Sequence, residues 1–234
     1  MAKKKFYGVA VGRVCGIFKD WATTEKQVKS FPGAKFKGFA SEEAARRWLE
    51  NPTFSKEENK EDGIDVVALQ QKFPGEVVVY TDGGCRKNPG PGGYGVVIVE
   101  DGRLRELQGG FRLTTNNRME VLAAIVALSE LEECRSRIRL FSDSSYLVNA
   151  VNKGWINRWI RNGWRKKDGQ PVANVDLWRK LSAILARIDV VFCWVKGHEG
   201  DEGNERCDRL ATDAYRTQAV IPDKGFEETL ASGQ

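Results

Sequence analysis

Four carboxylates occur at positions from which they could act together. Asp82 follows the apolar run VVVYT, and Asp143 ends the run IRLFS. If these runs are parallel neighbouring strands, both carboxylates emerge at the same carboxyl edge of the sheet, where open α/β sheets place their sites. Glu120 falls in the first turn of a predicted helix over 117–132, and Asp208 borders the apolar stripe of another over 203–216. Each alone also fits a turn cap, an N-cap or a helix-surface acid.

Together, four carboxylates would repel one another unless cations neutralised them. Hard oxygen ligands of this kind suit Mg²⁺ or Mn²⁺. Two such ions could activate water and stabilise the leaving oxygen of a phosphodiester. The stretch DGGCRKNPGPGGYG after the strand has neither a dinucleotide-binding nor a P-loop spacing. We therefore expect Asp82 to be a metal ligand, and the glycines to let a nucleic-acid backbone approach the sheet edge.

His198 is the only histidine, in the loop VKGHEGDEGNE. A lone histidine is usually a surface residue. The flanking glycines and the nearby Asp208 also suit a mobile group that transfers a proton or assists product release.

The segment NKGWINRWIRNGWRKK (152–167) interleaves tryptophans with cations and holds no acid. The spacing of Trp155 and Trp159 fits core packing as well as contact with bases or sugars. The cations, Arg158 and Arg161 among them, predict a phosphate-binding arm.

The order of elements sets the fold class. Strands at 77–81, 94–100 and 104–111 precede the helix at 117–132, and later come a strand at 137–142, a helix at 144–152, a strand at 189–195 and the helix at 203–216. This order predicts an α/β fold with a mixed sheet covered by helices.

The pattern of the N-terminal part predicts a separate structural unit. Strands at 5–11, 14–21 and 35–39 alternate with helices at 23–31, capped by a threonine, and 41–50. The polar run from Asn51 to Gly75 then changes composition abruptly, which indicates a linker that is flexible over its first half. We predict four parts: a domain at 1–50, a linker at 51–75, a domain at 76–216 and a tail at 217–234.

The charge distribution and the cysteines indicate which partners and which cellular compartment suit the protein. Of a net charge of +5, residues 1–50 hold eleven Lys/Arg against five Asp/Glu, which suggests a polyanionic partner. Five cysteines without a CxxC pair argue against a disulfide framework and a zinc site. The chain shows no signal peptide and no span long enough for a bilayer. We expect a monomer in the cytoplasm without membrane partners.

Five motifs, in order and spacing, resemble ribonuclease H of the type 1 branch: YTDGGCRKNPGPGGYG, TTNNRMEVLAAIVAL, LFSDSSY, WINRWIRNGW and WVKGHEGDEGNERCDRLA. FYGVAVGRVCGIFKDW, FPGAKFKGFAS and EEAARRWL resemble the small hybrid-binding, or viroplasmin-like, domain found ahead of this nuclease in many relatives. The resemblance implies a ribonuclease H-like mixed five-stranded sheet with helices on both faces, preceded by a small α+β domain.

The resemblance also implies the activity, which is hydrolysis of the RNA strand of an RNA·DNA hybrid to 3′-hydroxyl and 5′-phosphate ends with two Mg²⁺, for which Mn²⁺ can substitute. It implies these roles: metal-binding catalysis by Asp82, Glu120, Asp143 and Asp208; proton transfer or product release by His198; RNA 2′-hydroxyl contacts by Asn88, Asn116 and Asn117; DNA-strand contacts by Thr115, Trp155, Arg158, Trp159 and Arg161; and hybrid contacts by Tyr7, Trp21, Lys35, Phe36 and Lys37.

Two departures from the family pattern reduce the expected contacts. Ser145 replaces a longer side chain, often Gln, and Gly38 stands where some relatives carry lysine. Two alternatives stay open: a hybrid-binding protein in which the nuclease-like fold is a scaffold, and an integrase or transposase relative with the same carboxylate chemistry.

Overall fold

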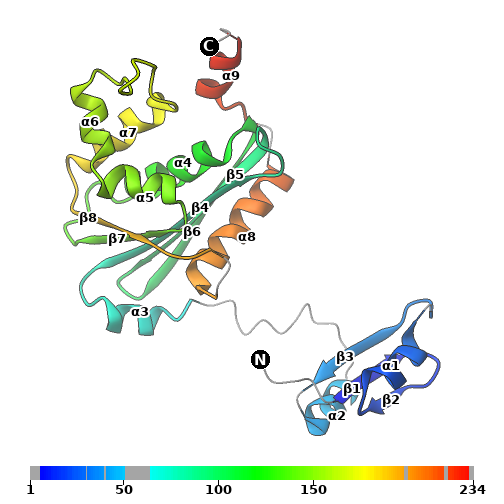
Figure 1. Cartoon of the computed structure of the whole chain (residues 1–234). Coiled ribbons are helices and arrows are strands. Elements are labelled where there is room, and N and C mark those ends of the chain that lie inside the picture. The colour runs from blue at the N-terminus through cyan, green and yellow to red at the C-terminus, as the bar shows by residue number, and fades with distance from the viewer. Residues whose placement is uncertain are drawn as a thin grey trace. The chain divides into compact units, whose positions relative to one another are not determined.

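The computed structural model describes residues 6–29, 31–39, 41–50, 64–197, 200–218 and 221–231. The chain divides into two compact units, residues 1–61 and 62–234 (Figure 1). His198 lies outside the described residues. In the described part, no helix combines the length and the apolar character needed to cross a bilayer.

The first unit is a three-stranded antiparallel sheet with two helices. The sheet order is β2–β1–β3, and the elements are β1 (Phe6–Val11), β2 (Gly16–Phe18), α1 (Trp21–Val28), β3 (Lys35–Phe39) and α2 (Glu42–Glu50). The prediction of a threonine cap for α1 is wrong. Asp20 is the N-cap, and its Oδ1 accepts a hydrogen bond of 2.7 Å from the backbone N–H of Thr23. Asp20 therefore starts the helix earlier than expected and brings Trp21 into its first turn.

The second unit is built on a mixed five-stranded sheet, as the resemblance implied, and its strand order is β6–β5–β4–β7–β8. Antiparallel pairing joins β4, β5 and β6, whereas β4–β7 and β7–β8 are parallel. The strands are β4 (Val77–Cys85), β5 (Gly90–Glu100), β6 (Arg103–Thr114), β7 (Ile138–Ser142) and β8 (Val190–Trp194).

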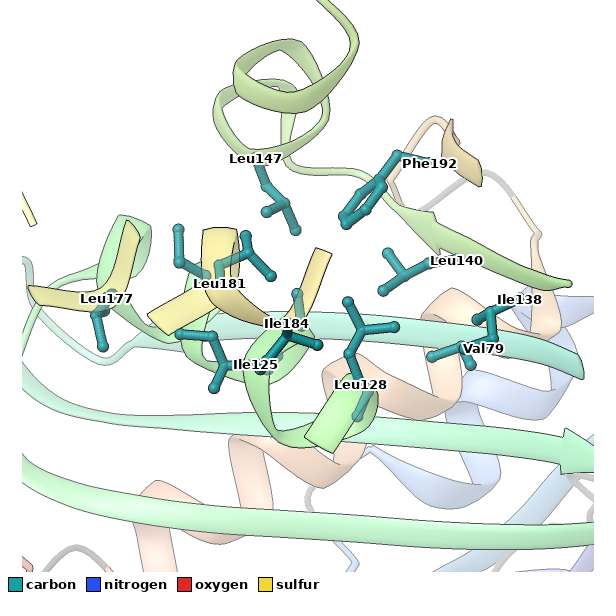
Figure 2. Close-up of a cluster of buried hydrophobic side chains, with 14 of the residues drawn as sticks. Val79, Ile125, Leu128, Ile138, Leu140, Leu147, Leu177, Leu181, Ile184 and Phe192 are labelled. Atoms are coloured by element: carbon teal, nitrogen blue, oxygen red, sulfur yellow. The ribbon is translucent and has the colours of Figure 1, made fainter. Parts of the chain in front are cut away.

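Helices cover both faces of this sheet (Figure 1). On one face lie α4 (Asn116–Ser129), α5 (Ser145–Asn152), α6 (Trp155–Arg161) and α7 (Val175–Leu185), and on the other lies α8 (Glu202–Thr217). Alternate strand residues supply the two cores, since successive side chains point to opposite faces. Val79 and Leu140 pack with Leu128, Leu147 and other residues of the first core (Figure 2).

The end of the segment predicted to be a linker belongs to the second unit. It forms α3 (Val66–Lys72), and Ile64 and Leu69 pack with the core on the α8 face. The guanidinium carbon of Arg139 lies over the ring of Phe73, 4.6 Å from the ring centroid. Residues 64–73 are therefore fixed on the sheet.

The C-terminal segment also packs on the second unit. The backbone N–H of Arg112 donates to the carbonyl of Ile221 at 2.9 Å, and α9 (Lys224–Ala231) follows. Asp223 is buried. The segment predicted as a tail thus continues the edge of the sheet at β6.

The glycine-rich stretch differs from its prediction. β4 extends to Cys85 and β5 begins at Gly90, so most of the stretch is strand, beyond the predicted strands at 77–81 and 94–100. A Cβ on Gly83 would overlap the backbone of Met119 in α4, and one on Gly95 would overlap the carbonyl of Cys207 in α8. At these two positions the missing side chain admits the protein's own helices and not a nucleic-acid backbone.

Candidate active site

Asp82 and Asp143 emerge side by side. Tyr80 of β4 pairs in parallel with Phe141 of β7, and each aspartate follows its partner strand residue by two positions. The two carboxylates therefore leave the same sheet edge on the same face, as the sequence predicted. The predicted alternative that Asp143 caps the next helix is wrong. Ser144 is the N-cap of α5 and accepts from the backbone N–H of Leu147 at 3.2 Å.

Glu120 is brought to this edge by close packing of α4 on β4. Gly83, the neighbour of Asp82, touches the α4 backbone at Met119 and Glu120. The hydroxyl of Ser144 donates a hydrogen bond to Oε2 of Glu120. Ser144 thus joins the carboxylate of α4 to the residue that follows Asp143.

Asp143 is framed by the segment that leads from β8 into α8. Its backbone carbonyl accepts from the indole N–H of Trp194 at 3.0 Å. Its Oδ2 accepts from Nδ2 of Asn204 at 3.4 Å, and a Cβ on Gly197 would overlap the same oxygen. Asp208 lies one turn after Asn204 on α8, so both side chains share a face of that helix.

Asp82 lies close enough to the other three carboxylates for their charges to act on it. Burial, and then the negative charges of Asp143, Asp208 and Glu120, raise the pKa of Asp82 to about 7, although the N–H of Gly83 donates to its Oδ1 at 2.7 Å. Burial and the charge of Asp143 also raise the pKa of Glu120 above its usual value, against the hydrogen bond from Ser144. Ionisation of Asp82 and Glu120 is therefore less favourable here than in water.

The donor set suits a hard divalent cation, because it consists of carboxylate oxygens. Within the described ranges, no three acidic, histidine or cysteine side chains close around one point to form a preformed cage.

The predicted RNA-contacting asparagines form a linked group beside this edge. The backbone N–H of Asn116 donates to Oδ1 of Asn88 at 3.2 Å, and Oδ1 of Asn116 accepts from the backbone N–H of Cys85 at 2.8 Å. Thr115 is the N-cap residue of α4, and Asn117 is exposed in its first turn. Asn88 and Asn116 are therefore held by the scaffold, whereas the side chain of Asn117 faces solvent.

The predicted arm separates into packing and charged residues. Trp155 and Trp159 are half-buried against the main core, and Trp159 lies 5.4 Å from the ring of buried Trp178. Arg158 and Arg161 are exposed on α6. Both tryptophans thus contribute to the core, and the arginines form the solvent-facing cations.

In the first unit, Trp21 lies between two other aromatic residues. Its ring centroid is 5.6 Å from that of Tyr7 and 5.6 Å from that of Phe36, and the residue is 44% exposed. Lys35 and Lys37 flank Phe36 on β3. This arrangement combines an aromatic surface with neighbouring positive charge.

Ser144 and Asn204 were not predicted as site residues. The position of Ser144 at a helix start was a signal, and so was the four-residue spacing between Asn204 and Asp208, which places both on one helix face. Neither signal says that the partner would be a carboxylate.

Comparisons with known proteins agree with this geometry. A sequence model described as RNase H matches residues 74–216, and one described as Ribonuclease H1 N-terminal domain matches residues 5–49. The ribonuclease H of Syntrophus aciditrophicus is 50% identical over 64% of this chain and 87% of its own length. The ribonuclease HI of Synechocystis is 49% identical over 65% of this chain and 96% of its own.

Solved structures share the fold. LC9-RNase H1, described as a type 1 RNase H with the type 2 active-site motif, aligns with a TM-score of 0.54 and 30% identity over 67% of this chain and 81% of its own. A foamy viral protease-reverse transcriptase in complex with dsDNA aligns with a TM-score of 0.53 at 22% identity, over 60% of this chain and 94% of its own.

The fold, the acidic edge and these matches define an enzyme that hydrolyses nucleic acid. The chain belongs to the ribonuclease H family, whose members cleave the RNA of RNA·DNA hybrids, and its first unit is the N-terminal domain of ribonuclease H1 proteins.

Proposed function

We propose that this chain is an endonuclease that hydrolyses the RNA strand of RNA·DNA hybrids and leaves 3′-hydroxyl and 5′-phosphate ends. The observation that carries the proposal is that Asp82 and Asp143 leave the same edge of the sheet and Glu120 is packed against it, where burial and then the charges of Asp143, Asp208 and Glu120 raise the pKa of Asp82 to about 7. Such a cluster has a physical reason to exist only where cations neutralise it.

Asp82, Glu120, Asp143 and Asp208 would hold two Mg²⁺, or Mn²⁺ in their place. When bound, the ions supply charge stabilisation to the attacking and leaving oxygens of an in-line displacement. The chain's own part is to hold the four carboxylates at one edge of the sheet and to orient them. Ser144 orients Glu120, and Trp194 fixes the backbone at Asp143. His198 would assist proton transfer or product release.

The proposed substrate contacts are those that the resemblance to the family implies. Asn88, Asn116 and Asn117 would read RNA 2′-hydroxyls in the minor groove, which separates RNA from DNA. Thr115, Trp155, Arg158, Trp159 and Arg161 would contact the DNA strand. In the first unit, Tyr7, Trp21, Lys35, Phe36 and Lys37 would bind the hybrid, with Trp21 and Phe36 against DNA sugars.

The proposed division of labour follows the predicted ranges: hybrid binding by residues 1–50, tethering by 51–75 and catalysis by 76–216. Packing of residues 64–73 and 221–231 on the catalytic unit shortens the free tether and extends the catalytic body at its C-terminus. We further propose that the protein works as a monomer in the cytoplasm. All five cysteines, each within the described residues, are free thiols, which suits a reducing compartment.

The test uses end-labelled RNA annealed to DNA, the same RNA annealed to RNA, and the single strand, each incubated with the protein and Mg²⁺. We expect cleavage of the hybrid alone. Asp143→Asn should abolish cleavage and retain hybrid binding, whereas Asp213→Asn, an exposed aspartate on α8, should stay active.

The outcomes separate the alternatives. Binding without cleavage in either Mg²⁺ or Mn²⁺ would favour the hypothesis of a hybrid-binding protein whose nuclease-like fold is a scaffold. DNA strand transfer would favour the hypothesis of an integrase or transposase relative. Full activity of Asp143→Asn would show that the site is assigned to the wrong residues.

A further inference from the structure

Asn204 is a buried amide beside the acidic edge. It is the third residue of α8 and is 1% exposed. Its Nδ2 donates to Oδ2 of Asp143 at 3.4 Å. Among the described residues its Oδ1 has no hydrogen-bond partner. One end of this amide is therefore engaged with a catalytic carboxylate, and the other end is an unused acceptor.

The orientation of the amide follows from its neighbour. An ionised carboxylate only accepts hydrogen bonds, so the nitrogen must face Asp143, and the reverse orientation would place two oxygens against each other. Because Oδ1 and Nδ2 are bonded to the same carbon, the unused oxygen is also close to Asp143. Asp208 shares this face of α8. The surrounding ionised groups are acceptors, so a donor for Oδ1 must come from outside the carboxylate set.

A structural role alone does not explain this amide. A buried carbonyl without a partner costs about 1–3 kcal/mol, and most buried polar atoms avoid that cost. The start of α8 does not need the side chain of Asn204, because Asp201 is the N-cap and accepts from the backbone N–H of Asn204 at 3.0 Å. An apolar side chain of similar shape would serve the fold better.

We propose that Asn204 is a positioning residue for the cation site. Its Nδ2 holds one oxygen of Asp143 so that the other faces the cation, and its Oδ1 accepts a hydrogen bond from a water molecule that the cation coordinates. This inference rests on the proposed function. Partners that orient metal ligands typically change metal affinity by about 10- to 100-fold when removed.

The test measures Mg²⁺ binding by calorimetry to the full chain without hybrid. We expect Asn204→Ala to weaken Mg²⁺ binding by about tenfold or more. The matched control is Asp213→Ala, at an exposed aspartate of the same helix, and it should bind Mg²⁺ as the wild type does. In steady-state assays Asn204→Ala should lower kcat and leave KM for the hybrid unchanged, with partial recovery at high Mg²⁺.

Asn204→Leu separates function from folding, because it removes the unsatisfied carbonyl and keeps the shape. It should keep or raise the melting temperature and still lose Mg²⁺ affinity. Wild-type Mg²⁺ affinity in folded Asn204→Ala and Asn204→Leu would overturn the inference. A wild-type protein that binds Mg²⁺ but cleaves no hybrid would instead overturn the proposed function, and the Mg²⁺ comparison would still decide the role of Asn204.

Discussion

Arg118 and Asp223 form a doubly hydrogen-bonded ion pair, with Nε–Oδ2 and Nη2–Oδ1 distances of 2.7 and 2.8 Å, across 105 residues of chain. Thr114 donates to the same carboxylate at 2.6 Å, and Arg118 also binds both oxygens of Asp176 in α7. Although burial raises the pKa of the Asp176 carboxyl, the hydrogen bonds from Arg118 hold it below its usual value. Since Arg118 lies two residues before Glu120, the C-terminal segment is tied to the helix that carries this proposed catalytic carboxylate.

Asp223→Ala should lower the free energy of unfolding by about 3 kcal/mol, because it leaves the buried guanidinium with one of its two carboxylates. Denaturant titration monitored by tryptophan fluorescence measures this loss. Glu227→Ala is the control, since it breaks the partly exposed pair with Arg112 and should cost much less stability than Asp223→Ala. Equal losses in the two variants would contradict a special role for the buried pair.

The sequence predicted those features that depend on local pattern. Short apolar runs located the strands, and the ends of two of these runs located Asp82 and Asp143. The pairing of Arg118 with Asp223 could not be predicted from the sequence. Charged residues are usually exposed, and this contact depends on how elements that are distant in the sequence pack together.

The glycines show the same limit. Their number predicted the close approach of another backbone. A backbone does approach Gly83 and Gly95, but it belongs to the protein's own helices and not to a nucleic acid. Whether a glycine faces a helix or a ligand depends on tertiary packing. The buried state of Asn204 is likewise a product of packing, because an asparagine in the first turn of a helix is usually exposed.

The cation-free protein should lose stability as the pH rises. Folded Asp82 titrates at about pH 7, whereas the unfolded chain titrates near pH 4. Between these values the folded state binds more protons, so the free energy of unfolding falls as pH increases and is lowest above pH 7. Urea titrations in EDTA should show a decline of up to about 4 kcal/mol that Asp82→Asn lacks. The same decline in Asp82→Asn would assign it to other groups.

Two adjacent asparagines should behave differently on replacement by alanine. Asn117 is exposed, so Asn117→Ala should leave the melting temperature unchanged and raise KM for the hybrid about fivefold, the value of one hydrogen bond. Asn116→Ala also removes the bond to the backbone of Cys85, so it should lower stability as well. Thermal melts beside KM measurements distinguish the two, and an unchanged KM in Asn117→Ala would remove its proposed contact.

Substitutions in the arm at 152–167 should likewise separate effects on stability from effects on hybrid binding. Trp159→Ala removes packing against Trp178 and should cost about 3 kcal/mol of stability. Arg158→Ala and Arg161→Ala should leave stability unchanged and reduce the salt dependence of hybrid binding by about one unit of slope each. Fluorescence anisotropy over a range of salt concentrations measures these slopes. A wild-type slope in the double arginine variant would mean that the arm does not contact phosphates.

Trp21 provides the sharpest test of the first unit, because it is the exposed member of an aromatic trio. Stacking on a base or sugar is worth about 1–3 kcal/mol, so Trp21→Ala should weaken hybrid binding about tenfold while kcat at saturating substrate stays the same. Deletion of residues 1–50 should likewise weaken hybrid binding and leave kcat unchanged. The loss of binding should be largest at raised salt, since the tethered unit raises the effective concentration of hybrid at the nuclease. Val14→Ala, at an exposed apolar residue in the turn between β1 and β2, is the control. If Trp21→Ala binds as the wild type does, while the deletion does not, the hybrid contacts the first unit through its lysines and not through its aromatic surface.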